Sequence, residues 1–308
     1  MKCICSHYGD NWKRVMSNMF SIFKTSEGEV CFNEAYDRLL ATWPVLYESI
    51  HVQTDYGTTH IVVSGDVDAP PLVLLHGMTF NSTMWRDNIE ALSSRYRTYC
   101  VDTLGDFGRS IVNKPLSSPQ HCNDWLNQVL DGLGLAKVDL IGHSMGGWLA
   151  LNFVLEYSNR LNRLVLLAPI ASIYRVPLQF MFKVYPALLR PSPPRIRRAW
   201  NWFVASGNQT DELVMDQIIQ SWTHCRILLK VIPTRFKEEH LRRLKTRTLF
   251  LVGDKEVIYN AHKAVERVRS WLPNAQAVVI PKASHCLTAE QADAVNKCIM
   301  DFLEKGAS

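Results

Sequence analysis

The amino-acid sequence predicts an α/β protein, with a mostly parallel, doubly wound sheet and a helical lid insertion. Two observations predict this class. Short runs that are apolar at every residue, such as residues 72–75, alternate with segments of helical periodicity. Such runs are typical of parallel strands buried on both faces, joined by crossover helices. One long segment, residues 170–244, interrupts the alternation before it resumes.

The pattern predicts an N-terminal helical segment, a core in two pieces and an inserted cap. These are residues 1–48, residues 49–169 with 245–308, and residues 170–244. Phe32, Tyr36, Leu39 and Leu40 fall on one face of a helix in the first segment. The expected core elements are strands 51–54 and 59–63 around a tight turn, strands 72–75 and 99–101, helix 118–133, strand 138–141, helix 146–157, strands 164–168 and 248–252, helix 261–269, strand 277–280 and helix 289–303.

The inserted segment differs from the core in composition. It is rich in Pro, Trp, Phe and Arg, and short helices are expected at residues 197–204, 211–219 and 226–232. Residues 157–210 contain eight Arg or Lys and no Asp or Glu. These cations either solvate an otherwise apolar lid or attract anionic substrates or a lipid surface.

Composition limits the function classes. The chain has 308 residues, 47% hydrophobic and 20% charged, which is typical of a globular protein. A net charge of +5 is too small to indicate nucleic-acid binding. The eight cysteines lack C-x-x-C spacing, so we expect neither a zinc site nor a disulfide framework. The sequence shows no secretory signal and no membrane-spanning run, which favours the cytoplasm and no stable membrane insertion.

A motif that can carry a nucleophile lies between the strand at 138–141 and the helix at 146–157. Gly142-His143-Ser144-Met145-Gly146 matches G-x-S-x-G, and a strand before and a helix after are the context that this motif requires. Small residues allow a sharp strand-to-helix turn that exposes the Ser144 hydroxyl. The N-terminus of the helix then provides free N–H groups below it.

A serine hydroxyl becomes a useful nucleophile when a base removes its proton. Where such a turn carries the nucleophile, the chain order is nucleophile, acid, histidine. His224, His240 and His262 fall in the insertion or on an exposed helix. His285 follows the strand at 277–280, at a carboxyl end where doubly wound sheets place reactive groups. His285 is therefore the predicted base.

The third member of the triad must accept the other N–H of the imidazole. Two acids follow the strand at 248–252, Asp254 and Glu256. No carboxylate follows the strand at 164–168, which removes the other common position. The usual Gly-x-x-acid spacing favours Glu256, with Asp254 as the alternative or as an acid that caps the loop.

Two backbone N–H groups are needed to stabilise an oxyanion. Met145, directly after the nucleophile, supplies one, and Met78 after the strand at 72–75 supplies the other in this interpretation. Gly77 permits the bend that turns the Met78 amide inward and is expected to border the substrate. His76 fits a structural role in the loop better than a catalytic one.

An apolar acyl pocket is expected beside the site. Phe107 lies in a glycine-containing loop, residues 102–110, in which Asp102 is expected to brace the backbone. Trp148 lies one turn into the helix after Ser144. We assign Phe107 and Trp148, with Gly77, to substrate binding, although aromatic residues at helical spacing are more often part of a core.

These motifs, in this order, resemble the α/β-hydrolase superfamily over about residues 50–170 and 245–305. Residues 74–85 and 252–260 are similar to bacterial carboxylesterases of the naproxen-esterase type. A glutamate at position 256, where most relatives hold aspartate, is the main departure. The resemblance implies a serine hydrolase that cleaves small-molecule carboxylic esters without metal or cofactor, through Ser144, His285 and Glu256.

Three alternatives fit the same residues. A carbon–carbon bond hydrolase or a perhydrolase uses the same triad, and a slow-turnover receptor can be built on the same scaffold. The serine at position 144 argues against dehalogenases and epoxide hydrolases, which need a carboxylate there. Oligomeric state is not defined by the sequence.

Overall fold

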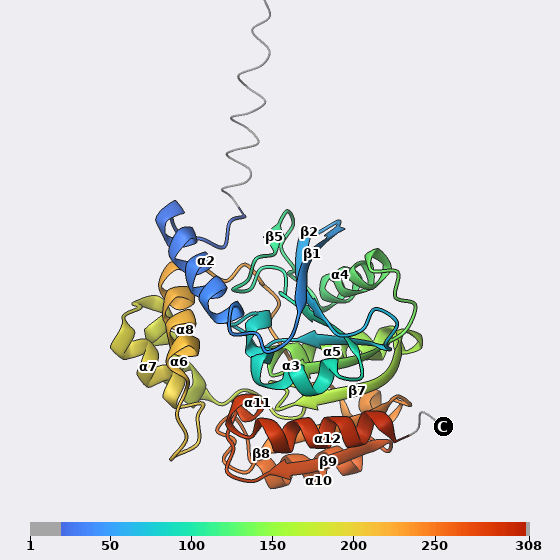
Figure 1. Ribbon diagram of the computed structural model, residues 1–308. Coiled ribbons are helices and arrows are strands. Elements are labelled where there is room, and N and C mark those ends of the chain that lie inside the picture. The colour runs from blue at the N-terminus through green and yellow to red at the C-terminus, as the bar shows by residue number, and fades with distance from the viewer. Residues whose placement is uncertain (1–19, 306–308) are drawn as a thin grey trace, which may run out of the picture.

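The computed structural model describes residues 20–305, which form a 9-stranded sheet with helices on both faces (Figure 1). Its strands are β1 Tyr47–Thr54, β2 Gly57–Ser64, β3 Pro71–Leu75, β4 Arg97–Val101, β5 Ile111–Val112, β6 Val138–His143, β7 Leu161–Leu167, β8 Arg247–Gly253 and β9 Ala275–Ile280. The order is β1-β2-β4-β3-β6-β7-β8-β9, with β5 beside β2. From β4 to β9 along this order all neighbours are parallel, so the predicted mostly parallel α/β fold is confirmed.

Helices cover the sheet on two sides. Those of the described residues are α2 Ser26–Leu40, α3 Arg86–Ser93, α4 Pro119–Gly132, α5 Met145–Glu156, α6 Leu178–Leu189, α7 Pro193–Asn201, α8 Glu212–His224, α9 Glu238–Arg242, α10 Ala261–Trp271, α11 Leu287–Glu290 and α12 Ala292–Glu304. Helices α3 and α12 pack together on one face, and α4 and α5 pack together on the other (Figure 1). In the part of the chain that the structure describes, no helix is both long and apolar enough to span a membrane.

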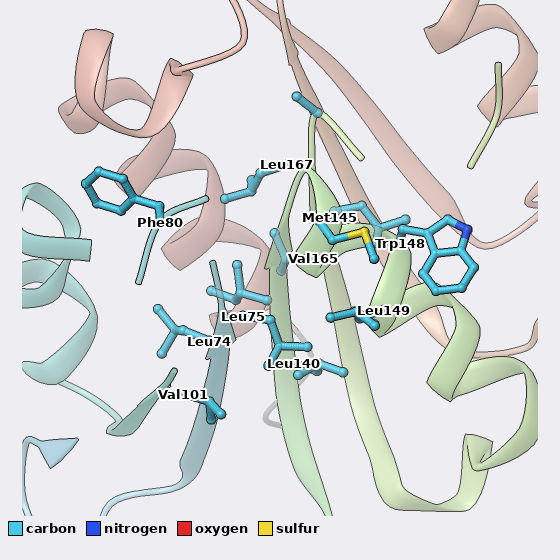
Figure 2. Close-up of a cluster of buried hydrophobic side chains, with 14 of the residues drawn as sticks. Leu74, Leu75, Phe80, Val101, Leu140, Met145, Trp148, Leu149, Val165 and Leu167 are labelled. Atoms are coloured by element: carbon cyan, nitrogen blue, oxygen red, sulfur yellow. The ribbon is translucent and has the colours of Figure 1, made fainter. Parts of the chain in front are cut away.

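The core lies between the sheet and these helices. Figure 2 shows Leu140 and Val165 of the central strands against Met145 and Leu149 of α5. All four side chains are buried. Each fully buried aliphatic side chain contributes about 1.5–3 kcal/mol. The apolar face of α5 therefore fixes the start of that helix against the carboxyl ends of the strands.

The strand order reverses between β3 and β6. The chain leaves β3 toward β4 on one side and leaves β6 toward β7 on the other. Leu75 pairs with Gly142, so the loops after β3 and β6 emerge side by side. Doubly wound sheets bind ligands in the crevice at such a reversal.

The inserted segment, residues 170–244, carries α6, α7, α8 and α9 between β7 and β8. Helix α7 begins at two prolines, which favour the first turn of a helix. Helix α6 was not predicted, because it is apolar around most of its circumference and contains Pro186. The predicted helix 289–303 is divided at Gln291 into α11 and α12.

The predicted helix at 226–232 is wrong. This stretch is extended, because its backbone N–H groups donate to distant carbonyls rather than to one another. Arg226 N–H donates to the Ile22 carbonyl, and Lys230 N–H to the Leu116 carbonyl. Leu228 and Leu229 both donate to the Gly105 carbonyl.

Helix α2 packs against α8 of the inserted segment (Figure 1). Its buried face includes the predicted Phe32, Tyr36, Leu39 and Leu40. The Lys24 N–H donates to the His224 carbonyl and so joins the segment before α2 to the end of α8. The first 19 residues of the predicted N-terminal segment lie outside the described residues.

Candidate active site

Ser144 lies at the sharp turn between β6 and α5 with φ 50° and ψ −112°, a conformation that costs a non-glycine residue about 1–3 kcal/mol. The flanking glycines allow this turn. A Cβ atom at Gly142 would lie 2.2 Å from the Gly146 carbonyl oxygen, and one at Gly146 would lie 2.2 Å from that of Leu75. The chain is therefore packed too tightly for any side chain at either position, and Ser144 is held in a strained, fixed place.

His285 reaches Ser144 from the loop after β9. Its Nε2 lies 2.8 Å from the Ser144 Oγ, and its Nδ1 lies 2.9 Å from Glu256 Oε2. An ionised Glu256 only accepts, so Nδ1 carries the proton and Nε2 accepts from the serine hydroxyl. The structure thus brings together three residues that are 141 and 29 positions apart in the sequence.

The two candidate acids occupy different environments. The Glu256 side chain is fully buried, and its second oxygen accepts from the Ile258 N–H at 2.9 Å. Asp254 is 26% exposed, lies 3.4 Å from the Lys255 ammonium and accepts from the Ala283 N–H at 3.3 Å. Asp254 braces the loop and makes no hydrogen bond or ion pair with His285.

The backbone of the His285 loop is held from two directions. The N–H groups of His285 and Cys286 both donate to the Phe203 carbonyl of the inserted segment, at 3.1 and 3.3 Å. His143 Nε2 donates to the His285 carbonyl at 2.8 Å. Burial, with a further effect from the neighbouring His285, lowers the pKa of His143 to about 3. His143 is therefore neutral at ordinary pH and holds the loop without adding charge.

Two backbone N–H groups of the loops beside Ser144 are without an acceptor in the part of the chain that the structure describes. Within residues 20–305, neither the Met78 nor the Met145 N–H has a hydrogen-bond acceptor. A Cβ atom at Gly77 would lie 2.8 Å from His143 Nδ1 and 3.4 Å from the Ser144 Cβ, so this loop runs directly beside the turn. The Gly146 N–H donates to the His76 carbonyl and joins the loop to α5.

His76 and Asp102 have structural contacts. His76 Nδ1 donates to the Gly77 carbonyl at 2.8 Å, and its Nε2 accepts from the Thr103 N–H at 2.9 Å, which confirms the predicted structural role. Asp102 accepts from the N–H groups of Ser82 and Arg109. Burial alone would raise the pKa of Asp102, but the nearby His60 imidazole and these bonds lower it below its usual range.

A small cavity of about 100 Å³ opens at Ser144 and His285. Gly77 and Met78 form part of its wall. Most of the remaining wall is apolar and comes from the inserted segment and the β3 loop: Phe80, Met84, Ile170, Phe180, Val184, Trp200, Phe203, Val214 and Trp222. Arg86 and Asp87 also border this cavity, but its wall is mainly apolar, and a small, mainly apolar space of this kind suits a short organic group next to a serine.

Comparison with known proteins identifies the family. A family model described as the alpha/beta hydrolase family matches residues 72–297. This chain belongs to the alpha/beta hydrolase family. It is 35% identical to the carboxylesterase nap of Bacillus subtilis (strain 168), over 92% of this chain and 95% of that protein. It is 33% identical to the carboxylesterase YbfK of the same organism, over 91% of this chain and 96% of that protein.

Solved structures agree with the sequence relatives. The crystal structure of naproxen esterase from Bacillus subtilis is similar with a TM-score of 0.86 and 33% identity, covering 91% of this chain and 100% of that one. The crystal structure of carboxylesterase CesB (YbfK) from Bacillus subtilis gives a TM-score of 0.84 and 32% identity, covering 91% of this chain and 99% of that one. The resemblance predicted from the sequence is confirmed.

In this hydrolase, two predicted pocket residues lie elsewhere. Trp148 does not border the cavity at Ser144: its indole N–H donates to the Thr234 carbonyl at 3.0 Å, and its ring stacks on Phe236. The Trp148 and Phe80 rings lie on opposite sides of the cluster in Figure 2. Phe107 borders a second, larger cavity instead. Trp148 is a core residue, because its side chain is buried against Thr234 and Phe236 of the inserted segment.

Three residues that position the site were not found from the sequence. His143 and Phe203 hold the His285 loop, as described above. Glu290 accepts from the Ser284 N–H at 2.8 Å and from the side chain of Asn208 in the inserted segment. His143 had a usable signal, since it adjoins the nucleophile, whereas the Phe203 carbonyl carries no side-chain signal.

Proposed function

We propose that this chain is a carboxylesterase that hydrolyses esters through an acyl-enzyme on Ser144. The observation that carries the proposal is the continuous chain of hydrogen bonds from Ser144 Oγ through His285 to the buried Glu256 carboxylate. A serine activated in this way is the arrangement that acyl transfer needs. The names of the Bacillus subtilis relatives, both carboxylesterases, support the ester as the substrate class.

In the first half of the reaction, the Ser144 Oγ attacks the ester carbonyl carbon while His285 Nε2 takes the hydroxyl proton. The carbonyl π electrons move to oxygen and give a tetrahedral oxyanion. When the intermediate collapses, the bond to the alcohol oxygen breaks and His285 returns the proton to that oxygen. In the second half, water replaces the alcohol and the same steps run in reverse to release the carboxylic acid.

Electrostatics favour these intermediates. The free N–H groups of Met78 and Met145 can donate to the oxyanion, and the N-terminus of α5 adds its partial positive charge. Glu256 stabilises the imidazolium that forms on His285. His143, which is neutral because burial lowers its pKa, places no second positive charge beside that imidazolium.

The inserted segment, residues 170–244, acts as the lid in this proposal. Phe180, Trp200 and Phe203 from this segment border the cavity at Ser144. A cavity of about 100 Å³ selects a short group on one side of the ester. The core of the enzyme is residues 49–169 with 245–308.

The test uses short-chain p-nitrophenyl esters and a fluorophosphonate label. We expect steady-state turnover, and labelling of Ser144 identified by peptide mass spectrometry. The Ser144→Ala variant should lose at least about 10⁴-fold in kcat. Turnover that survives in Ser144→Ala, or a label on another residue, contradicts the proposal. A single stoichiometric burst without steady-state turnover identifies a slow receptor instead.

A further inference from the structure

A second, larger cavity of about 940 Å³ lies against the cavity at Ser144. The two cavities share Met78, Ile170, Phe180 and Trp222 as wall residues. A ligand that fills both would therefore pass directly beside Ser144. The mechanism proposed above uses only the smaller one.

The larger cavity combines apolar walls with a cationic rim. Its walls include Phe107, Val176, Leu188, Leu229 and Val231. Five cations also border it: Lys24, Arg175, Arg226, Lys230 and Arg235. None of the lining residues within 20–305 is an Asp or Glu. We call these five side chains the cationic rim.

The cationic rim has no acidic partner among residues 20–305. Within the described residues, none of its five side chains has a carboxylate oxygen within 4.0 Å, whereas Arg197 and Arg38 nearby pair with Glu212 and Asp216. In the described part of the chain, Lys24 Nζ donates only to the carbonyls of Trp222 and Thr223, and the Arg226 side chain donates to that of Phe23. All five rim residues are exposed. Their charge is available to a ligand.

The backbone below the rim is held in a fixed position. The Gly105 carbonyl accepts the N–H groups of Leu228 and Leu229 at 2.7 and 2.9 Å. Gly105 has φ 84°, and a Cβ atom there would lie 2.8 Å from the Leu229 N. Only glycine permits this approach, so the extended stretch 226–231 is built into the wall of the cavity.

We propose that the larger cavity binds the remote part of an anionic, amphiphilic ester. The apolar chain lies against the walls, the anionic group lies at the cationic rim, and the ester carbonyl lies at Ser144. This inference rests on the proposed esterase function and names the substrate class: esters whose acyl chain ends in a carboxylate. Cations without acidic neighbours, beside a low-dielectric wall, attract and orient such an anion.

An anionic lipid surface is the competing partner for the same charges. Helix α6 exposes Leu178, Phe182 and Leu189, each at least 77% exposed. The cavity is favoured because the five cations border it, whereas α6 itself carries only Lys183 among its 12 residues. The experiment distinguishes an anionic ester bound in the larger cavity from an anionic lipid surface bound at the same cations.

The first arm compares two substrates that differ in one charge, p-nitrophenyl hydrogen suberate and p-nitrophenyl methyl suberate. We expect kcat/KM to be at least about tenfold higher for the anionic ester at low salt, and the ratio to fall as ionic strength rises and screens the rim. Equal kcat/KM values for the two esters, in an enzyme that hydrolyses both, overturn the inference and leave the esterase function intact.

The second arm changes the rim. The triple variant Arg175→Gln, Lys230→Gln, Arg235→Gln removes three rim charges that make no side-chain hydrogen bonds within the described residues. The control triple Lys183→Gln, Arg190→Gln, Arg198→Gln removes the same net charge from exposed cations of the inserted segment that do not border the cavity. We expect the anionic preference to fall to about twofold or less in the rim variant and to persist in the control. Equal losses in both variants would assign the effect to net charge and overturn the proposal.

The third arm removes catalysis. Isothermal titration of Ser144→Ala should show monomethyl suberate binding at least about tenfold more tightly than dimethyl suberate. This preference would stand even if ester turnover failed.

Flotation with phosphatidylglycerol vesicles is the last arm. Binding to vesicles that is lost in Leu178→Gln/Phe182→Gln, together with no preference between the two suberates, would assign the rim to a lipid surface and overturn the proposal.

Discussion

The sheet edge that carries Ser144 and the inserted segment above it are built in opposite ways. At the sheet edge, Gly142 and Gly146 leave no space for a methyl group, and Ser144 is strained. In the inserted segment, Gly207 has nothing within 4 Å, and α6 presents apolar side chains to solvent. The comparison indicates that backbone contacts fix the position of Ser144, the proposed nucleophile, whereas the proposed lid is built from side chains that can change at little cost to the fold.

The largest effect should come from the two acids at the sheet edge. We expect Glu256→Gln to lower kcat/KM by about 10³–10⁴-fold, because Gln presents the wrong partner to His285 Nδ1. Asp254→Asn is the matched control and should stay within about fivefold of wild type, since Asp254 only braces the loop. Steady-state kinetics on one chromogenic ester measure both. The reverse order of effects would show that Asp254 replaces Glu256 in solution.

A methyl group tests the backbone difference directly. Gly146→Ala should lower the free energy of unfolding by at least about 3 kcal/mol, because its Cβ meets carbonyl oxygens that cannot rotate away. Gly207→Ala, in the inserted segment, should cost about 1 kcal/mol from its positive φ alone. Urea denaturation followed by circular dichroism gives both values. Similar losses would remove the contrast between the regions.

The buried His143 predicts a pH dependence at the sheet edge. Its folded pKa of about 3 lies below its ordinary value of 6.5, so its contribution to stability is complete above pH 6.5 and is lost as the pH falls toward 3. In that window, the unfolding free energy should fall by up to about 1.4 kcal/mol per pH unit from this residue. His143→Gln should flatten the slope, whereas the exposed His240→Gln should not. Denaturant midpoints between pH 4 and 7 provide the measurement, and equal slopes in all three proteins would exclude the effect.

The smallest effect should come from the outer face of α6. Phe182→Gln should change the free energy of unfolding by less than about 0.5 kcal/mol, because the ring is 78% exposed. Phe180→Ala on the inner face of the same helix should cost about 3 kcal/mol. Thermal melting of the two variants compares the faces. A large loss in Phe182→Gln would mean that another part of the protein covers that face.

The sequence was most informative where the signal is local. Apolar strands and the G-x-S-x-G turn depend on neighbours in the chain, and they predicted the sheet and the position of Ser144. His285 and Glu256 followed from their places after strands. The structure places His285 within hydrogen-bond distance of Ser144, and Glu256 within hydrogen-bond distance of His285.

The sequence was least informative where distant carbonyls decide the conformation. Residues 226–232 have a helical pattern, yet their N–H groups are taken by Ile22, Gly105 and Leu116. The direction of Trp148 depends on a carbonyl at Thr234, 86 positions away. All four partners act through backbone carbonyls, which every residue has, so the local sequence pattern does not identify them.

The Phe203 carbonyl links the two regions at one atom. It accepts the N–H groups of both His285 and Cys286, so the proposed general base is held in place by the segment that we propose as the lid. A ligand that pushes that segment outward would also tilt the imidazole away from the serine. Substrate affinity and the rate of the chemical step are therefore coupled in this proposal. A substrate of the wrong shape would both bind more weakly and react more slowly.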